Sequence, residues 1–282
     1  MANEGTTNVI FRVRRYDPDR DAAPYYQDFT VPVPPGMVVL EGLWYIKEHM
    51  DATLSWRVSC RMGVCGSCGM LINGSPTLAC NTQIHDVARD GLLMVAPLPN
   101  FDIIRDLVPD LGPLFDRHSH LMPFIVREDH DEMQEPSDQY WQSADDLLEY
   151  LQFTYCIKCG CCMAACPTFA TDPTYSGPQP LAQAYRYMID SRDGAFEERK
   201  AILAGEAGPW RCHYAGECSA VCPKGVDPAR AIQLMKRELV LDYLRLGKLR
   251  RRKPAGVLPP EKKRGRREGI PEHPPFTVEG AG

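Results

Sequence analysis

The stretch that decides the fold is residues 156–167, with the sequence CIKCGCCMAACP. Its cysteines Cys156, Cys159, Cys162 and Cys166 follow the spacing C-x2-C-x2-C-x3-C, and a proline comes directly after the last. In iron–sulfur proteins with two clusters, such a run gives three thiolates to one cluster and its fourth thiolate to the other. A structural zinc site needs no fourth thiolate at that offset. The run therefore predicts a domain built around two iron–sulfur clusters.

A second run repeats this register with one change, because residues 212–223 read CHYAGECSAVCP and Ala215 stands where a full run has a cysteine. If the last cysteine of each run ligates the cluster of the other run, one cluster receives four thiolates and the other receives three. The two sets are Cys156, Cys159, Cys162 and Cys222 on the one hand, and Cys166, Cys212 and Cys218 on the other. We expect the first cluster to be [4Fe–4S] and the second to be [3Fe–4S]. The alternative for the second is a four-iron cluster with water or another ligand at its open corner.

The first third of the chain carries a different spacing, Cys60-x4-Cys65-x2-Cys68, with Cys80 after a longer gap. This is the spacing of plant-type ferredoxins, which hold a [2Fe–2S] cluster. Glycines between these cysteines allow backbone N–H groups to approach the inorganic sulfurs and offset their negative charge. Two close cysteine pairs can also bind zinc, but the interleaved glycines favour the cluster.

Cys161 is the one cysteine outside these three sets. It neighbours a ligand but breaks the register of the run. We expect a small buried thiol there. A spare ligand is the alternative, and the spacing gives it no support.

Hydrophobic patterns divide the chain into a β-rich first third and a helical second half. Alternation predicts strands at residues 9–13 and 29–33, the latter at a sheet edge because of its prolines. A helix over 39–50, a hairpin at 70–74 and a short strand at 92–95 complete a small mixed sheet crossed by one helix. Pro-rich and acidic residues over 98–142 indicate a connector with one helix.

Helices follow in the second half. One is expected from Ser143, with Asp146 completing a capping box, and another over 180–191. Asp227 and Pro228 predict the start of a third helix. Its apolar face is expected to carry Ile232, Met235, Leu239 and Tyr243. We therefore divide the chain into a [2Fe–2S] domain (1–104), a connector (105–142), a helical domain with the other two clusters (143–246) and a basic, flexible tail (247–282).

Charge and composition narrow the class of protein. The chain has 282 residues, twelve cysteines and a net charge of −5. Its start lacks a basic and apolar leader, so we expect no secretory signal and reduced thiols available to metal. No run of eighteen apolar residues occurs. Residues 245–267 carry eleven Lys or Arg and one acid, which suits an anionic lipid surface, a membrane partner or RNA, with a solvated tail as an equal alternative.

Together these motifs resemble the iron–sulfur subunit of succinate dehydrogenase and fumarate reductase. The likeness covers residues 8–245 approximately. It rests on the stretches SCRMGVCGSCG (59–69), CIKCGCCMAACP (156–167), YRYMIDSRD (185–193) and CPKGVDP (222–228). The resemblance implies an α+β fold, with an N-terminal β-grasp [2Fe–2S] domain and a C-terminal α-helical ferredoxin domain.

The resemblance also implies partners. In that family a FAD-containing flavoprotein oxidises succinate or reduces fumarate, and a transmembrane anchor binds quinone, often with haem. Electrons pass between flavin and quinone through [2Fe–2S], [4Fe–4S] and [3Fe–4S] clusters. The chain itself shows no flavin signature, phosphate loop or catalytic motif, so we expect a non-catalytic electron-transfer subunit. We place it peripherally on the cytoplasmic face of a bacterial plasma membrane, with no nucleic-acid partner.

The same resemblance places quinone beside the three-iron cluster. The candidate residues by position are Pro167, Thr168, Trp210, His213, Gln233 and Lys236. Gln233 and Lys236 lie one turn apart and share a helix face, which is similar to the fumarate reductase branch and favours menaquinone. Thr171 stands where many succinate dehydrogenases have a quinone-binding tryptophan. The alternatives are a solvated helix face for Gln233 and Lys236, and a satisfied, partly buried histidine for His213.

Two other functions compete with this interpretation. One is a cluster subunit of another flavin dehydrogenase, such as a thiol-dependent fumarate reductase, although such subunits usually carry extra cysteine-rich modules. The other is a zinc-stabilised protein that binds nucleic acid through its basic tail. The absence of zinc-finger spacing and the two Cys-Pro run ends argue against it.

Overall fold

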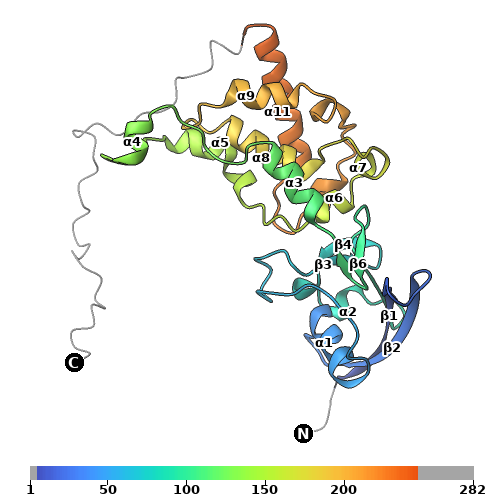
Figure 1. Ribbon diagram of the computed structural model, residues 1–282. Coiled ribbons are helices and arrows are strands. Elements are labelled where there is room, and N and C mark those ends of the chain that lie inside the picture. The colour runs from blue at the N-terminus through green and yellow to red at the C-terminus, as the bar shows by residue number, and fades with distance from the viewer. Residues whose placement is uncertain (1–4, 247–282) are drawn as a thin grey trace, which may run out of the picture.

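The computed structural model describes residues 5–246 and contains a β-rich half and a helical half that pack against each other (Figure 1). The predicted tail over 247–282 lies outside the described residues. Within 5–246, the longest helices are too short and too polar to cross a lipid bilayer.

The first half is a five-stranded mixed sheet with one helix across it. Its strand order is β2-β1-β5-β3-β4, with β1 and β5 parallel and the other neighbours antiparallel. The elements are β1 (Thr7–Arg15), β2 (Tyr25–Val33), α1 (Val39–His49), β3 (Gly69–Ile72), β4 (Ser75–Leu78), α2 (Ile84–Val87) and β5 (Leu92–Ala96). The predicted strands, helix and hairpin are confirmed, and β2 lies at an edge as its prolines indicate.

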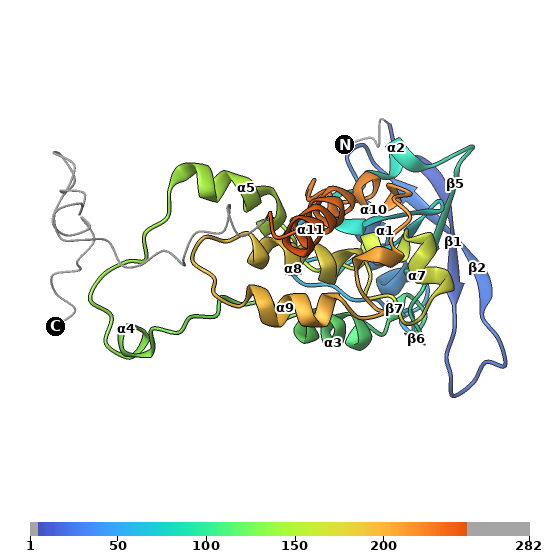
Figure 2. The same ribbon diagram turned by 90° about the horizontal axis from the view of Figure 1, so that it is seen from above.

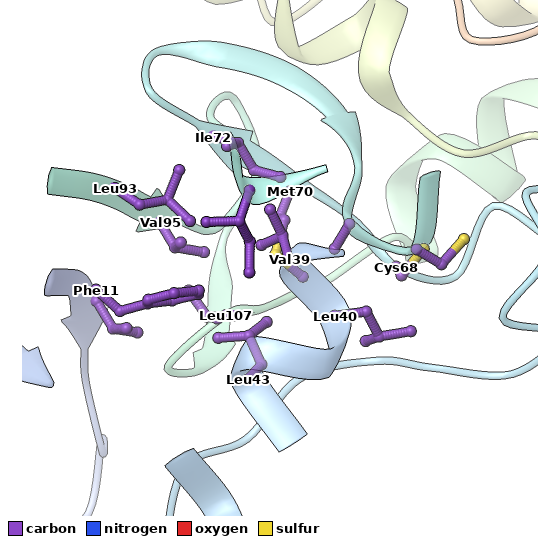
Figure 3. Packing of buried hydrophobic residues seen from close by; sticks show 14 of the residues in the cluster. Phe11, Val39, Leu40, Leu43, Cys68, Met70, Ile72, Leu93, Val95 and Leu107 are labelled. Atoms are coloured by element: carbon purple, nitrogen blue, oxygen red, sulfur yellow. The ribbon is translucent and has the colours of Figure 1, made fainter. Parts of the chain in front are cut away.

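The core of this half follows from alternation. Val9, Phe11 and Val13 of β1 are buried while the residues between them face outward. Figure 3 shows Val39 and Leu43 of α1 gathered with Phe11 in one apolar cluster, and Cys68 at its margin. The helix lies so close to the sheet that a Cβ on Gly42 would overlap the ring of Phe11.

The segment between the halves holds more structure than its composition suggests. It contains a small ribbon and two helices, where the sequence predicted one helix: β6 (Ile103–Arg105), β7 (Val108–Pro109), α3 (Gly112–His120) and α4 (His130–Gln134). Leu107, between the two strands, is buried in the core of the first half. Helix α4 has no buried residue and lies on the side away from the sheet (Figure 2). Sequence periodicity misses it because it is one short, polar turn.

The second half is built from helices. They are α5 (Ala144–Thr154), α6 (Cys161–Ala164), α7 (Pro167–Thr171), α8 (Pro178–Met188), α9 (Phe196–Leu203), α10 (Glu217–Ala220) and α11 (Pro228–Tyr243). The side chain of Ser143 accepts the Asp146 N–H at the start of α5, and Asp227 accepts the Arg230 N–H at the start of α11. Both predicted caps are therefore confirmed.

Helices α8 and α11 pack along each other at the centre of this half. Ile232, Met235 and Leu239 face the core as predicted. The assignment of Tyr243 to that face is wrong, because its side chain is 86% exposed. The buried face of α11 continues through Asp242, which is 7% exposed, so Tyr243, one residue further on, lies off that face.

A buried ion pair ties the segment before α4 to the helical half. Arg199 of α9 pairs with Asp193, and the side chains are 0% and 1% exposed. The same guanidinium donates to the backbone carbonyls of Met122 and Phe124. The ion pair is buried, and its bonds to these two carbonyls fix the path of residues 122–126.

The two halves share one core at their seam. Cys159, Cys161 and Ala164 belong to the helical half by sequence, yet they are buried in the apolar cluster of the first half. Asn100, just after β5, donates its side-chain N–H groups to the carbonyls of Met163 at 3.1 Å and Ala164 at 2.9 Å. The first half thus holds the region around α6 both through its apolar core and through Asn100.

Candidate metal centres

The cysteines of the first half gather on the loop between α1 and β3. Cys60, Cys65 and Cys68 come from this loop, and Cys80 comes from the short turn Ala79–Asn81 after β4. Arg61 and Gly63 adopt positive φ, which curls the backbone around the sulfurs.

Backbone N–H groups point at these sulfurs. Cys60 Sγ accepts the N–H groups of Met62, Val64 and Cys65 at 3.3–3.4 Å, and Cys80 Sγ accepts that of Gly63 at 3.2 Å. Donors aimed at sulfur stabilise negative charge there. The donor set of this loop therefore fits an anionic cluster bound through thiolates.

Two of these thiols differ in acidity. Hydrogen bonds, chiefly from the Ser67 side chain, lower the pKa of Cys65 to about 6. Burial raises the pKa of Cys68 to about 12. Cys68 therefore needs a nearby metal charge to be a thiolate at neutral pH.

A cavity in the helical half is lined by all four cysteines of the predicted [4Fe–4S] set: Cys156, Cys159, Cys162 and Cys222. Its empty volume is about 380 Å³. Among residues 5–246, no three His, Cys, Asp or Glu side chains converge closely enough for a single metal ion. Thiols spread around a cavity fit a polynuclear cluster better than a zinc ion.

A second cavity is lined by the three cysteines of the other predicted set, Cys166, Cys212 and Cys218. Its empty volume is about 310 Å³, and Ala215 lines it as well. Burial raises the pKa of Cys218 to about 11. The structure thus brings together each of the cross-run ligand sets that the sequence predicts.

The backbone of the two cysteine runs is a structural repeat. Lys158 and Tyr214, each two residues after the first cysteine of a run, have φ of 54° and 60°. Gly160 and Gly216 both have φ of 84°, and each begins a one-turn helix, α6 or α10. By this repeat, Ala215 occupies the place that Cys159 holds in the first run.

The [2Fe–2S] loop and the first cysteine run touch through glycine. Gly66 has φ of 76°, and a Cβ there would lie 2.9 Å from Cα and Cβ of Cys159 and from the carbonyl oxygen of Ile157. The carbonyl of Cys159 also lies close to Gly69. Only residues without a side chain permit this approach, so two candidate centres sit in neighbouring loops.

Cys161 is fully buried at this same seam, 0% exposed, in the core of the first half. Its thiol is hydrogen-bonded to Cys159, which raises the pKa of Cys161 further than burial alone. Among the described residues it lines neither cysteine cavity. This placement agrees with a small buried thiol that packs the seam.

The candidate quinone residues lie together on one side of the second cavity. Pro167, Thr168 and His213 line it. Lys236 Nζ donates to the carbonyl of Cys212 at 2.8 Å, and Gln233 Nε2 lies 4.0 Å from Cys212 Sγ. The exposed Trp210 ring has its centroid 6.0 Å from Lys236 Nζ. His213 is exposed, and Gln233 and Lys236 are half-buried on the face of α11 that lies beside Cys212.

Sequence reasoning missed three polar residues beside the cavities. Gln179 and His118 are buried next to the first cavity, and Tyr175 is 1% exposed in the wall of the second. Gln179 Nε2 lies 3.8 Å from Cys156 Sγ and 3.3 Å from His118 Nδ1. Burial raises the pKa of Tyr175, as do the nearby thiols. No motif marks these residues, because none of them lies inside a cysteine run.

Comparison with protein families agrees with the two kinds of centre. Residues 10–116 match the family described as "2Fe-2S iron-sulfur cluster binding domain". Residues 152–226 match the "4Fe-4S dicluster domain". These matches confirm a [2Fe–2S] domain followed by a dicluster domain in an α+β chain.

Similar proteins cover most of the chain. The "Fumarate reductase iron-sulfur subunit" of Mycobacterium tuberculosis is 46% identical over 81% of this chain and 91% of that protein. Its namesake in Haemophilus influenzae is 40% identical over 86% and 97%. The mitochondrial "Succinate dehydrogenase [ubiquinone] iron-sulfur subunit" of Candida glabrata is 38% identical over 82% and 91%. A chain of the "Mycobacterium smegmatis Sdh1 complex in the apo form" superposes with a TM-score of 0.76 at 27% identity, covering 85% of this chain and 98% of that one.

Proposed function

Because the chain belongs to the family of iron–sulfur subunits of fumarate reductase and succinate dehydrogenase, we propose that it relays electrons between a FAD-containing flavoprotein and a membrane quinone. The flavoprotein interconverts succinate and fumarate. The single observation that carries this proposal is the grouping of eleven cysteines into three sets, one on the loop that contacts Cys159 and two around neighbouring cavities of the helical half.

The residues of this chain hold and insulate the centres. When bound, the clusters each accept and pass on one electron. Cys60, Cys65, Cys68 and Cys80 hold the [2Fe–2S] cluster, and Gly66 lets their loop contact Cys159. The seven cysteines around the two cavities hold a [4Fe–4S] cluster and, because Ala215 supplies no thiolate, a [3Fe–4S] cluster. Apolar side chains of α8 and α11 exclude water between them.

The quinone end lies at the second cavity. Lys236 supplies an ammonium group, and Trp210, His213 and Thr168 present an accessible edge beside Cys212. An amphipathic, carbonyl-bearing ring such as menaquinone suits one ammonium donor and an exposed indole. We place the chain on the cytoplasmic face of a bacterial plasma membrane, against a transmembrane anchor that binds the quinone, with or without haem.

The test is spectroscopic and compositional. The chain, purified with its partners from a membrane fraction, is assayed for iron, sulfide and flavin, and its EPR spectra are recorded oxidised and reduced. We expect three centres, with a [3Fe–4S] signal in the oxidised state that succinate removes. A colourless chain that holds zinc, or one without a flavoprotein partner, would contradict the proposal.

The quinone site has its own test. Lys236→Met should lower succinate-dependent quinone reduction at least tenfold while reduction of a soluble dye acceptor stays within twofold. The loss of one hydrogen bond to a charged group is enough for this effect. Arg237→Met on the same helix is the control, because Arg237 bonds only to Glu238 in the structure. An equal loss with dye would show that Lys236 maintains the fold instead.

A further inference from the structure

Gln179 is a buried amide beside the first cysteine cavity. It is 1% exposed and lines the cavity with Cys156, Cys159, Cys162 and Cys222. Its Nε2 is 3.8 Å from Cys156 Sγ, within the range of a weak N–H···S hydrogen bond. We propose that Gln179 is a positioning residue that raises the reduction potential of the [4Fe–4S] cluster by donating to the Cys156 thiolate.

The orientation of the amide supports this role. Nε2 also lies 3.3 Å from Nδ1 of His118, a ring nitrogen of a buried side chain on α3. Burial and the nearby Lys158 lower the pKa of His118 to about 4, so its ring is neutral at pH 7 and Nδ1 can accept. A flipped amide would turn Oε1 toward an anionic sulfur, which is repulsive.

In this orientation of the amide, its carbonyl oxygen is left without a hydrogen bond. Gln179 Oε1 is buried and has no hydrogen-bond partner among the described residues. Pro178 and Pro180 flank Gln179 at the start of α8 and restrict its backbone. A buried polar side chain with an unsatisfied acceptor is unfavourable for folding alone, which points to a use for its donor.

The second cavity has a matching contact. Gln233 of α11 places Nε2 4.0 Å from Sγ of Cys212, the first cysteine of the second run, as Gln179 of α8 does for Cys156. The two central helices thus each carry one amide to the first cysteine of one run. Because the same contact occurs in both runs, we do not interpret the contact of Gln179 as accidental.

The sign follows from charge. Reduction adds one negative charge to the cluster and its thiolates, and an N–H donor stabilises the more negative state. Removing the donor therefore lowers the potential. One weak hydrogen bond is worth about a threefold change in equilibrium constant. At a fixed potential the ratio of reduced to oxidised cluster should fall about threefold, or about 28 mV for one electron.

The experiment is an EPR redox titration of the assembled complex, with wild type, Gln179→Met and Gln179→Ala. The inference rests on the proposed function. If the wild type shows no [4Fe–4S] signal, the proposed function fails; if the signal is present and both variants titrate at the wild-type potential, only the role of Gln179 is overturned. The [2Fe–2S] and [3Fe–4S] potentials of the same samples should not move.

Gln183→Ala is the matched control. Gln183 lies one turn further along α8, is 6% exposed, and donates to the carbonyl of Phe153 at 2.8 Å. Gln183→Ala should leave the [4Fe–4S] potential unchanged. If this control shifts the potential as much as the Gln179 variants do, the shift comes from the packing of α8 and the proposal is overturned.

If the variants fail to load the cluster, the N–H···S contact can be tested on the wild type instead. With ¹⁵N-labelled glutamine side chains, pulsed EPR of the reduced [4Fe–4S] cluster should show a weak ¹⁵N hyperfine coupling. Absence of that coupling would exclude the N–H···S contact.

Discussion

Ala215 matters because it stands where the first run has a cysteine and therefore supplies no thiolate. It lines the second cavity with Cys166, Cys212 and Cys218, at the place that Cys159 holds in the first run. A thiol at this position would complete a set of four around a cavity of similar size.

We therefore expect Ala215→Cys to convert the proposed three-iron centre to a four-iron one. The EPR signal of the oxidised [3Fe–4S] cluster should disappear, and the iron content should rise by one per chain. Ala220→Cys, on the same short helix region but outside the cavity lining, is the control and should keep the signal. An unchanged spectrum in Ala215→Cys would mean that another group already fills the open corner.

Arg199 is the residue on which a long loop depends. Its guanidinium is fully buried with Asp193 and two backbone carbonyls. Arg199→Met should lower the free energy of unfolding by about 3–5 kcal/mol, because it leaves a buried carboxylate without its partner. Urea unfolding followed by circular dichroism measures this. Arg12→Met removes an exposed pair with Asp28 and should have a much smaller effect; equal losses would contradict the argument.

Asp51 gives the first half a dependence on pH. Burial raises its pKa, but hydrogen bonds from Thr53 and Arg15 outweigh this and lower the pKa of Asp51 to about 2. A lowered folded-state pKa adds stability that is complete above the unfolded value near 4 and is lost as the pH falls toward about 2.

Between pH 5 and pH 3 the wild type should therefore lose about 1 kcal/mol more than Asp51→Asn. Acid removes the clusters by protonating thiolates, so unfolding rates are compared directly after rapid mixing, through the fluorescence of Trp44 and Trp56. Parallel pH profiles for the two proteins would contradict the prediction.

At the scale of elements, the contact between two loops is the feature that couples the halves. Gly66 of the [2Fe–2S] loop touches Cys159 and Ile157, and it adopts positive φ. Gly66→Ala should force the loops apart by a few tenths of an ångström and strain the backbone by about 1 kcal/mol. Magnetic coupling between the reduced [2Fe–2S] and [4Fe–4S] clusters should weaken, measured as slower spin relaxation in EPR.

Gly74→Ala separates backbone strain from loop contact. Gly74 has φ of 82° in the β3–β4 hairpin, and a Cβ there meets nothing within 4 Å. It should lose similar stability and keep the wild-type relaxation rate. If both variants relax alike, the contact at Gly66 does not set the distance between the centres.

Periodicity predicted the elements that carry a buried face over several turns or strands. The strands β1 and β2 and the helices α1 and α11 belong to this class. The one-turn helices α6 and α10 were not foreseen. Each begins after a glycine with positive φ, Gly160 or Gly216, and is too short to show an apolar stripe. Tyr243 was misplaced because the buried face continues through Asp242, a polar residue that a search for apolar periodicity passes over.

At the scale of the whole molecule, the cavities make the helical half depend on iron. Seven cysteines surround them, whereas in the first half three cysteines lie on the loop before β3 and Cys80 lies on the turn after β4, beside a packed sheet. Removal of iron leaves buried thiols around open space, which loses packing and metal–ligand free energy.

Iron chelation under reducing conditions should therefore loosen α8 and α11 more than β1 and β5. Hydrogen exchange of the full chain, with and without iron, measures this difference. Addition of iron and sulfide should restore protection in the helices. Faster loss of protection in the sheet would contradict the ordering.

Part of the candidate site can be predicted from the cysteine spacing, and part is visible only in the folded structure. The cysteine spacings predicted the sets that line the two cavities, because each run of a two-cluster domain gives its last cysteine to the cluster of the other run. Gln179 and His118 could not be foreseen, since α3 and α8 bring them together from distant parts of the chain. The burial of Cys161 in the other half was equally hidden, as no pattern along a chain reports which core a side chain joins.

The shared core at the seam limits which chimaeras can be made between this chain and its relatives. Cys161 and Ala164 fill the core of the first half, and Asn100 of that half donates to the carbonyls of Met163 and Ala164. A gene fragment that encodes either half alone would leave an open apolar surface where the other belongs. The halves are therefore not interchangeable cassettes, and a chimaera between relatives must carry residues 98–101 and 159–164 from the same parent.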